Sequence, residues 1–554
     1  MTTVAARVAR TMLEQGVTYV FGVVGNGNFP IAGALEAGGA RYVAARHEGG
    51  AIAMADAFHH VTGRVGVCTA TYGPGFTNMA TGLADAAKHA AGVLAVAGDA
   101  PASGPRRIDV DQAALGNALG ARIVRVTEPS EAGRLTAEAL RLADTRGPVV
   151  LLVPCDLLEL PAPSGGAAAV PPPSAARREA AAPEAAAPEA AAAALDVLAA
   201  ARSPVLLAGA GARRAGAAPL IAALADVTGA LLTTTVMAAG AFTGHPSALG
   251  LCGGFAAPGA AGLIAAADAV VAFGASLGPW ALGRSAMLDP GATLVQVDVA
   301  ERATSSRVDL FVRGDANAVA GQLLREARAR GLPAAPGRAR AAARRRAGRR
   351  ETPHEDRSTS DRIDPRTLTR SLAGLLPRER TLVTDGGHFV AWPALYWPAR
   401  EPSALVFTGA SFQTIGLGLA GAVGAAVARP HRTVVAALGD GGALMGLPEL
   451  ETLIRVAASA LVVVYDDAAY GAEVHMYGDA GARSAATVFG DTDFAGVARS
   501  LGASAVTVRA VADLAAVRDW RRRGGRGVLV LDCKIVRDVV ADMFAVPPGA
   551  SDSR

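Results

Sequence analysis

The organisation of this chain is set by residues 436–473, which read AALGDGGALMGLPELETLIRVAASALVVVYDDAAYGAE. One apolar run ends in Asp440, which has glycine on both sides, and a second apolar run ends in Asp466 and Asp467. If both runs are parallel strands, their carboxyl ends meet at one edge of a sheet, where α/β proteins place their ligands. Glycine lets the backbone approach a phosphate closely, and Mg²⁺ commonly bridges phosphates to one or two carboxylates. The stretch therefore predicts a metal–diphosphate site, with an ordinary turn and a polar strand end as the alternative interpretation.

Strand-like apolar runs alternate with helical patterns along most of the chain. Residues 3–15 carry apolar side chains at helical spacing, residues 17–24 read as a buried strand, and residues 47–60 read as a helix. Such alternation is typical of parallel sheets covered by helices on both faces. Residues 92–99 also resemble residues 433–440, which fits two related sheets. We therefore predict an α/β fold of three doubly wound parallel-sheet domains.

Two segments of biased composition separate these predicted domains. Residues 164–194 are rich in Ala and Pro, cannot build a core, and are predicted to be a linker. Residues 331–362 are rich in Arg without interleaved aromatic residues, which favours a solvated linker over a nucleic-acid or lipid site. The predicted domains are an N-terminal domain at 1–163, a central domain at 195–330 and a C-terminal domain at 363–554.

The overall composition favours a protein of the cytoplasm. The chain is 51% hydrophobic and 18% charged, which excludes wholesale disorder. Its four cysteines have no metal-binding spacing, and the N-terminus lacks the features of a signal peptide. Residues 408–428 carry no charge, but their glycines and the polar pair Gln413 and Thr414 favour a buried loop and helix over a membrane span. We expect no nucleic-acid or membrane partner.

The Gly-Asp-Gly sequence at 439–441, followed after twenty-five residues by Asp467, resembles the diphosphate-binding motif of thiamine diphosphate-dependent enzymes. That family normally has two asparagines where this chain has Asp466 and Asp467. The resemblance implies three ligands for Mg²⁺, namely the Asp440 carboxylate, the Asp467 side chain and the Ala469 backbone carbonyl.

The N-terminal third carries a second resemblance. Residues 46–48 (RHE), 73–78 (GPGFTN) and 98–101 (GDAP) come in the order and spacing of the pyrimidine-binding domain of acetolactate synthase-like enzymes. The resemblance implies that Glu48 drives the cofactor's aminopyrimidine into the imino form that removes the C2 proton. The plain alternative is an acidic residue that favours a helix N-terminus. The same resemblance implies that Gln112 lies in the active site.

Local matches imply the remaining site residues. Glu473 falls where 2-oxo acid decarboxylases of this superfamily keep a catalytic glutamate, although a surface helix residue is the alternative. His475 is expected to be solvated. The predicted catalytic residues are Glu48, Gln112 and Glu473. The predicted cofactor-binding residues besides Glu48 are Gly73, Asn78, Gly387, His388, Gln413, Ile415, Gly439, Asp440, Gly441, Gly442, Ala443, Asp467, Tyr470 and Gly471.

Taken together, the resemblance implies a thiamine diphosphate- and Mg²⁺-dependent decarboxylase or carboligase that acts on a 2-oxo acid. It also implies a homodimer or homotetramer in which Glu48 faces the Asp440–Asp467 site across a subunit interface. The alternatives are a C–C lyase or carboligase without a 2-oxo acid donor, an acyl-CoA decarboxylase, and a non-catalytic relative that binds the cofactor. FAD is not predicted, because residues 275–280 (ASLGPW) lack the Arg-rich pattern that acetolactate synthases use for it.

Overall fold

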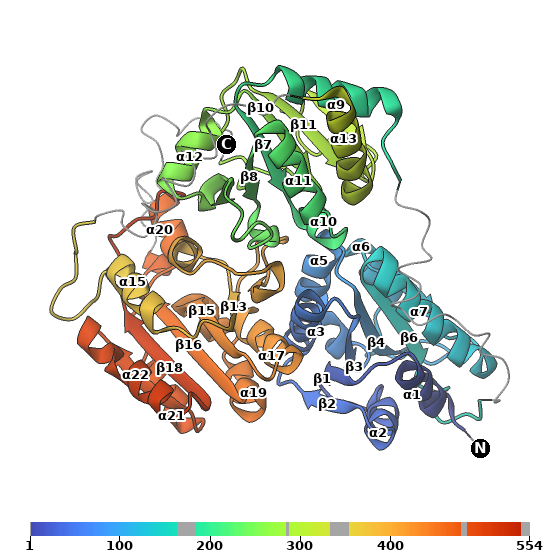
Figure 1. The fold of residues 1–554 in the computed structure, drawn as a ribbon. Coiled ribbons are helices and arrows are strands. Elements are labelled where there is room, and N and C mark those ends of the chain that lie inside the picture. Colours follow the sequence, from blue (N-terminus) through green and yellow to red (C-terminus); the bar gives the residue numbers. More distant parts are fainter. Residues whose placement is uncertain (1, 163–183, 284–286, 333–353, 478–484, 545–554) are drawn as a thin grey trace.

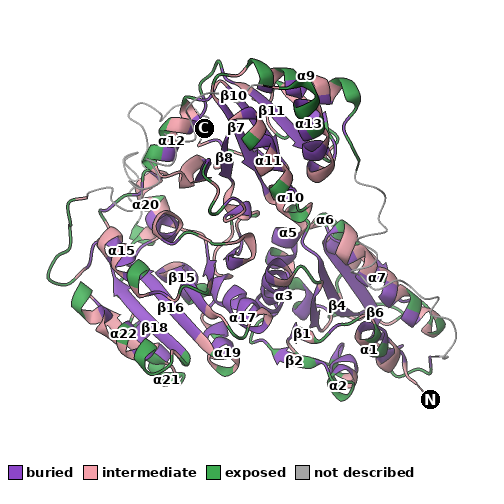
Figure 2. Ribbon diagram, in the orientation of Figure 1, coloured by how far each residue is buried: buried purple, intermediate pink, exposed green. Residues whose placement is uncertain are grey.

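The computed structural model describes residues 2–162, 184–283, 287–332, 354–477 and 485–544. Three six-stranded sheets follow one another along the chain, each parallel throughout and flanked by helices (Figure 1). The strands are largely buried, as Figure 2 shows, because helices cover both faces. This confirms the predicted α/β fold of three parallel-sheet domains.

The N-terminal sheet has the strand order β2-β1-β3-β4-β6-β5. Its strands are β1 (Tyr19–Gly22), β2 (Arg41–Ala44), β3 (Gly66–Ala70), β4 (Val93–Asp99), β5 (Arg122–Arg125) and β6 (Val149–Pro154). Its helices are α1 (Val4–Glu14), α2 (Phe29–Ala37), α3 (Glu48–Thr62), α4 (Pro74–Thr77), α5 (Ala80–Lys88), α6 (Gln112–Ala118) and α7 (Ala132–Arg146).

The central sheet has the order β12-β11-β10-β7-β8-β9. Its strands are β7 (Pro204–Ala208), β8 (Leu231–Thr234), β9 (Ala248–Leu251), β10 (Ala269–Phe273), β11 (Thr293–Asp298) and β12 (Leu310–Arg313). Its helices are α9 (Pro188–Ala200), α10 (Ala210–Arg214), α11 (Ala218–Thr228), α12 (Pro258–Ala265) and α13 (Ala316–Arg330).

The C-terminal sheet has the order β14-β13-β15-β16-β18-β17. Its strands are β13 (Arg380–Thr384), β14 (Leu405–Phe407), β15 (Thr433–Gly439), β16 (Ser459–Asp466), β17 (Ser504–Val508) and β18 (Gly527–Lys534). Its helices are α15 (Pro365–Leu375), α16 (Ala391–Tyr396), α17 (Gly418–Ala428), α18 (Asp440–Met445), α19 (Pro448–Val456), α20 (Gly471–Tyr477), α21 (Phe494–Ser500) and α22 (Ala515–Arg522).

The two outer sheets have the same strand order when their strands are numbered from the start of each sheet. The sequence similarity between residues 92–99 and 433–440 does not follow this equivalence. Strand β4 is the fourth strand of its sheet along the chain, whereas β15 is the third of its own. The two apolar runs that end in Gly-Asp are thus both buried strands, but they do not occupy equivalent positions in the two sheets.

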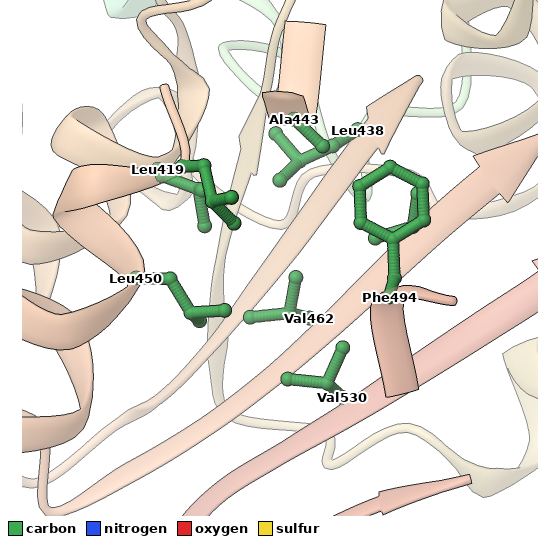
Figure 3. Close-up of a pocket in the computed structure, with 9 residues that line it drawn as sticks. Leu419, Leu438, Ala443, Leu450, Val462, Phe494 and Val530 are labelled. Carbon is green, nitrogen blue, oxygen red and sulfur yellow. The ribbon is translucent and has the colours of Figure 1, made fainter. Parts of the chain in front are cut away.

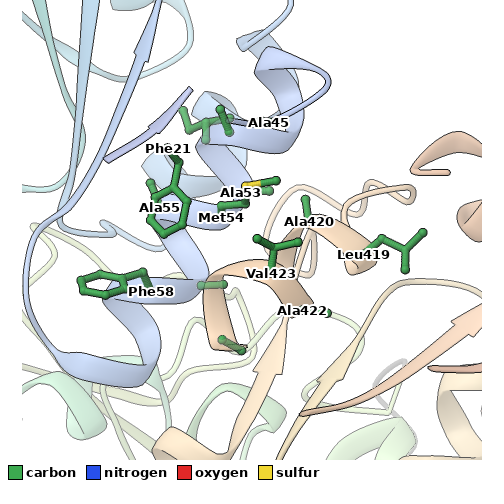
Figure 4. Close-up of a cluster of buried hydrophobic side chains, with 14 of the residues drawn as sticks. Phe21, Ala45, Ala53, Met54, Ala55, Phe58, Leu419, Ala420, Ala422 and Val423 are labelled. Atoms are coloured by element: carbon green, nitrogen blue, oxygen red, sulfur yellow. The ribbon is translucent and has the colours of Figure 1, made fainter. Parts of the chain in front are cut away.

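The two outer sheets share one hydrophobic core, in which α3 packs against α17 (Figure 4). Met54 and Phe58 of α3 lie with Leu419 and Val423 of α17 in this core. A Cβ atom on Gly424 would lie 2.2 Å from the Met54 carbonyl oxygen, so only glycine allows the helices to come this close. The uncharged run at 408–428 is accordingly a loop and a buried helix, and none of the described helices has the length and apolarity needed to cross a bilayer.

The structure corrects the first predicted linker. Helix α9 begins at Pro188, and its Ala191 and Ala194 are buried in the core of the central sheet. Residues 188–194 therefore belong to the central sheet's helical layer, because alanines on one face of a helix can be buried as well as solvated. The rest of that linker up to residue 183, and most of the Arg-rich segment (333–353), lie outside the described residues.

Candidate active site

The two acidic residues of the predicted metal site follow neighbouring strands. Strand β15 pairs with β16 so that Gly439 lies opposite Tyr465, and Asp440 and Asp467 follow within two residues. Both residues are buried, at 8% and 6% exposure. Burial and the neighbouring Asp467 raise the pKa of Asp440 to about 8, and burial raises the pKa of Asp467 to about 7. Two buried carboxylates that repel each other form a donor set suited to a hard divalent cation.

The backbone after Asp467 makes a sharp turn, because Ala468 has a φ of +53°. Asp467 Oδ1 accepts the Ala469 N–H at 3.2 Å, and Arg537 Nε donates to the Asp467 carbonyl at 2.8 Å. A left-handed conformation at alanine is uncommon, and such strain often marks functional loops. The turn holds Ala469, the third predicted ligand, beside the Asp467 carboxylate.

Close packing requires the glycines around this acidic pair. A Cβ atom on Gly441 would lie 2.6 Å from the Tyr470 ring, and one on Gly471 would lie 2.5 Å from Asp467 Oδ2. Helix α18 begins at Asp440, so its first turn contains the predicted cofactor-binding residues Gly441, Gly442 and Ala443. The glycines keep both loops near the carboxylates without a side chain in between.

A small apolar cavity lies between α18, α19 and the C-terminal sheet (Figure 3). It is lined by Leu419, Leu438, Ala443, Leu447, Leu450, Val462, Val464, Phe494 and Val530. Since all of these residues are apolar, the cavity is unsuited to a diphosphate and belongs to the core beneath the site. The Ala443 side chain faces this cavity, which leaves its backbone for the predicted cofactor contact.

Two buried carboxylates hold the loop that carries Gln413 and Ile415. At its start, Asp85 of α5 accepts the N–H groups of residues 409, 411 and 412 at 2.9–3.1 Å. At its end, Asp385 accepts the N–H groups of residues 416 and 418 at 2.7 and 3.2 Å, and that of residue 386 at 2.7 Å. Burial raises the pKa of Asp385 to about 6 although these N–H groups oppose the shift. The loop is thus fixed from both outer sheets.

The two predicted cofactor-binding residues of this loop differ in their exposure to solvent. Gln413 is exposed and has a φ of +57°, whereas Ile415 is half-buried. A Cβ atom on Gly386 would lie 3.0 Å from Ile415 Cγ2, so Ile415 packs on the loop that begins at Asp385. In that loop, Gly387 has a φ of +127°, a conformation that favours glycine.

The rings of His388 and His475 are in contact, with centroids 4.5 Å apart and planes tilted by 51°. His388 is buried, and burial lowers its pKa to about 3, so the neutral ring accepts the Ala541 N–H at 3.0 Å through Nε2. His475 is half-buried on α20, and its Nε2 is buried without a hydrogen-bond partner among the described residues. The expectation that His475 is solvated is wrong, because α20 folds its ring against His388.

Glu48 is the first residue of α3 and is buried, at 8% exposure. Asn78, at the end of α4, donates to Glu48 Oε2 at 2.9 Å. A Cβ atom on Gly75 would lie 3.2 Å from Glu48 Oε1, so the glycine in the 73–78 loop keeps space beside the carboxylate. The N-terminal motifs that are far apart in the sequence therefore meet around Glu48.

Gln112 ties two loops of the N-terminal sheet together. Its Oε1 accepts the Gly73 N–H at 2.7 Å, and its Nε2 donates to the Gly98 carbonyl at 2.8 Å. Gly73 has a φ of +59°, and Gln112 is only 2% exposed. In this structure the amide of Gln112 is used to place the glycine loop.

The predicted site residues thus form two groups, one at the edge of each outer sheet. No hydrogen bond or ion pair between described residues joins Glu48 to Asp440 or Asp467. Glu473 is exposed on α20, and Tyr470 is half-buried and stacks edge-on against Phe489 with centroids 5.0 Å apart.

Sequence reasoning missed several buried charged residues around the site, namely Asp85, Asp385, Glu449 and Lys534. Asp385 had a local signal, since an acid followed by two glycines stands directly after a strand-like run. Lys534 also had one, because it is one of only two lysines in the chain and ends an apolar strand. Asp85 and Glu449 had none, because the backbone N–H groups that they accept lie more than three hundred residues away.

Three family models match the chain, one for each sheet. They are the N-terminal TPP binding domain of thiamine pyrophosphate enzymes over residues 2–117, the central domain over 191–323, and the C-terminal TPP binding domain over 385–533. Together the matches span the Glu48, Asp440 and Asp467 positions.

Curated relatives match over most of their length. An acetolactate synthase of Arthrospira platensis is 29% identical over 98% of this chain and 96% of its own. The acetolactate synthase isozyme 2 large subunit of Escherichia coli (strain K12) is 29% identical over 84% of this chain and 83% of its own. A sulfoacetaldehyde acetyltransferase of Castellaniella defragrans is 29% identical over 91% of this chain and 88% of its own.

Proposed function

This chain belongs to the thiamine pyrophosphate enzymes, of the acetolactate synthase type, and we propose that it is a Mg²⁺-dependent decarboxylase and carboligase that acts on a 2-oxo acid. Thiamine diphosphate supplies, when bound, a nucleophilic thiazolium C2 that adds to a carbonyl and takes up the electron pair released with CO₂. Everything else depends on how the residues of this chain hold that cofactor and its substrates.

The role of Glu48 is to hold a proton at the N1′ atom of the aminopyrimidine. Its burial supports this role, because a carboxyl group exchanges a proton with a ring nitrogen more effectively away from water. The Asn78 amide holds one carboxyl oxygen, which leaves Oε1 for the ring nitrogen. Gly75 leaves space at that oxygen.

The diphosphate is held through Mg²⁺ in this proposal. Asp440, the Asp467 side chain and the carbonyl of Ala469 would be the protein ligands, and the N–H groups of Gly441 and Gly442 would bind the diphosphate. The high pKa values of the two aspartates support the assignment, since a divalent cation offsets the repulsion that raises them.

In this proposal the substrate is bound by residues around α20. Buried His388 and half-buried His475 present a pair of neutral rings, with His475 on α20, and Tyr470 and Glu473 lie on the same segment. In our proposal, His475 Nε2 accepts a hydrogen bond from substrate, and Gln112 acts by placing the Gly73 loop. Ile415 would support the rings of the bound cofactor.

The single observation that carries the proposal is the buried pair Asp440 and Asp467 at the carboxyl edge of a parallel sheet. The test is CO₂ release from a panel of 2-oxo acids, pyruvate first, with thiamine diphosphate and Mg²⁺. We expect release that requires both additions and that is lost in Glu48→Gln. No release from any acid, with the cofactor demonstrably bound, would overturn the 2-oxo acid donor. Product analysis then separates a free aldehyde from a ligation product.

A second candidate is acetyl transfer from a donor that is not a 2-oxo acid. The sulfoacetaldehyde acetyltransferase relative, which covers 91% of this chain, favours it. Acetyl transfer from such a donor proceeds without CO₂ release, so the panel above distinguishes the two candidates.

We also propose a homodimer, or a tetramer built from dimers, in which Glu48 faces the Asp440 loop of the partner subunit. Two observations support it. Glu48 itself makes no hydrogen bond or ion pair with Asp440 or Asp467 among the described residues, and Phe412, Leu444 and Met445 expose apolar side chains beside the C-terminal group. Light scattering in solution measures the assembly size.

A further inference from the structure

We propose that Glu449 is a positioning residue that fixes the backbone immediately preceding Glu48 in the sequence. This inference rests on the proposed role of Glu48. Glu449 lies in α19 of the C-terminal sheet and is 2% exposed. Its Oε1 accepts two backbone N–H groups, those of Arg46 and His47, each at 3.0 Å. These are the two residues that directly precede Glu48.

The carboxylate of Glu449 is itself held in place. Thr452 Oγ1, one turn along α19, donates to its Oε2 at 2.7 Å. A Cβ atom on Gly50 would lie 2.3 Å from Glu449 Oε1, so glycine at this position gives the carboxylate room. The buried acid, its two donors and the glycine opposite it form a fitted contact between α19 and the start of α3.

The other contacts between α19 and residues 44–46 are weaker than those of the Glu449 carboxylate. Arg46 Nε lies 2.8 Å from Glu451 Oε2, but the Arg46 side chain is 54% exposed. Arg455 donates to the Ala44 carbonyl at 2.5 Å, also at the surface. Exposed ion pairs contribute little to stability because solvent screens them. The buried Glu449 carboxylate is therefore the contact that fixes the backbone at Arg46 and His47.

Fixing this backbone matters for the chemistry of Glu48. The direction of a side chain at the first position of a helix depends on the backbone that leads into it. Proton exchange with a ring nitrogen needs the carboxyl group within hydrogen-bond reach, and supporting residues must keep it there. Since α18 and α19 are consecutive, Glu449 also connects the Asp440 loop to the Glu48 segment of the same chain.

The first experiment measures the backbone in the cofactor-free protein. Amide hydrogen exchange, followed by mass spectrometry, is compared for the peptide that contains residues 44–50. We expect faster exchange in Glu449→Ala than in wild type. Glu449→Gln should exchange as wild type does, because its amide oxygen still accepts both N–H groups. Glu451→Ala is the matched control from the same helix and should also be unchanged.

The second experiment measures the exchange of the C2 proton of bound thiamine diphosphate for deuterium, by acid quench and NMR, without substrate. We expect Glu449→Ala to slow this exchange by about 10- to 100-fold, with cofactor affinity within a few-fold of wild type. Glu449→Gln should restore most of the rate. If Glu449→Ala does not fold, Gly50→Ala provides the same test, because its methyl group displaces the carboxylate.

Two results would overturn the inference. One is a Glu449→Ala or Gly50→Ala protein whose C2 proton exchanges at the wild-type rate. The other is a Glu449→Gln protein that is as slow as Glu449→Ala, since hydrogen-bond acceptance would then not be what matters. A Glu48→Gln protein is measured beside them. If its exchange rate equals that of wild type, the proposed role of Glu48 fails, whatever Glu449 does.

Discussion

Lys534 Nζ lies 2.5 Å from Asp466 Oδ2, and both side chains are at most 3% exposed. The two residues lie opposite each other in the pairing of β16 with β18, and the same ammonium lies 2.9 Å from Asp532 Oδ1. Asp466 is the first of the two aspartates that stand where the family normally has asparagine. Its charge is therefore neutralised within the sheet by Lys534. Asp467 is the main charge that repels Asp440, and Asp466 adds a smaller repulsion.

This relationship predicts unequal effects of two substitutions. Lys534→Met leaves two buried carboxylates without a cation and should destabilise the protein by about 3–5 kcal/mol. Asp466→Asn keeps an oxygen for the Ala468 N–H and leaves Lys534 paired with Asp532, so we expect a loss of about 1 kcal/mol. Denaturant unfolding of both variants measures the difference. Equal losses would show that Lys534 does not neutralise Asp466.

The Asp440–Asp467 pair predicts how stability depends on pH without metal. Their folded-state pKa values, about 8 and about 7, lie above the value of about 4 expected for an unfolded aspartate. The folded protein therefore binds more protons than the unfolded chain between pH 4 and 8, and its stability should fall as the pH rises through that range.

Mg²⁺ should oppose this loss, because it binds the deprotonated carboxylates. In thermal unfolding with thiamine diphosphate present, added Mg²⁺ should raise the melting temperature more at pH 8.5 than at pH 6. Asp440→Asn serves as the control and should weaken both the pH dependence and the Mg²⁺ effect. A Mg²⁺ effect of equal size at both pH values would contradict the assignment.

The proposed dimer predicts that two inactive variants restore each other. Mixed subunits of Glu48→Gln and Asp440→Asn would form dimers in which one site has both residues intact and the other has neither. Random reassociation makes half of the dimers mixed, so about a quarter of the wild-type activity should return. If both residues of a site came from one chain, the mixture would stay inactive.

Substitution of His475 should affect turnover of the substrate but not binding of the cofactor. His475→Phe keeps an aromatic ring against His388 but removes the buried Nε2, which has no partner among the described residues. We expect kcat/KM for the 2-oxo acid to fall by about 10- to 100-fold while the affinity for thiamine diphosphate stays within a few-fold. A parallel loss of cofactor affinity would instead indicate a structural role for the ring.

Much of the fold could be predicted from local patterns. Apolar runs of strand length that end in Gly and Asp indicated parallel strands with ligands at their carboxyl ends, and β15 and β16 are such strands. The start of α9 could not be predicted in this way. An Ala/Pro-rich segment has the same composition whether it is a linker or a helix, and only packing against the central sheet decides.

The sequence by itself determined the acidic residues, their spacing, the glycines between them and hence the family, because these depend on a backbone motif of nearby residues. Only the tertiary structure decided which charges are compensated and which side chains are buried. Lys534 reaches Asp466 from the neighbouring strand β18, Glu449 reaches the N–H groups of Arg46 and His47 from a helix of the C-terminal domain, and α20 turns His475 inward. These contacts join residues far apart in the chain, and their free energies depend on burial, which a local pattern does not specify.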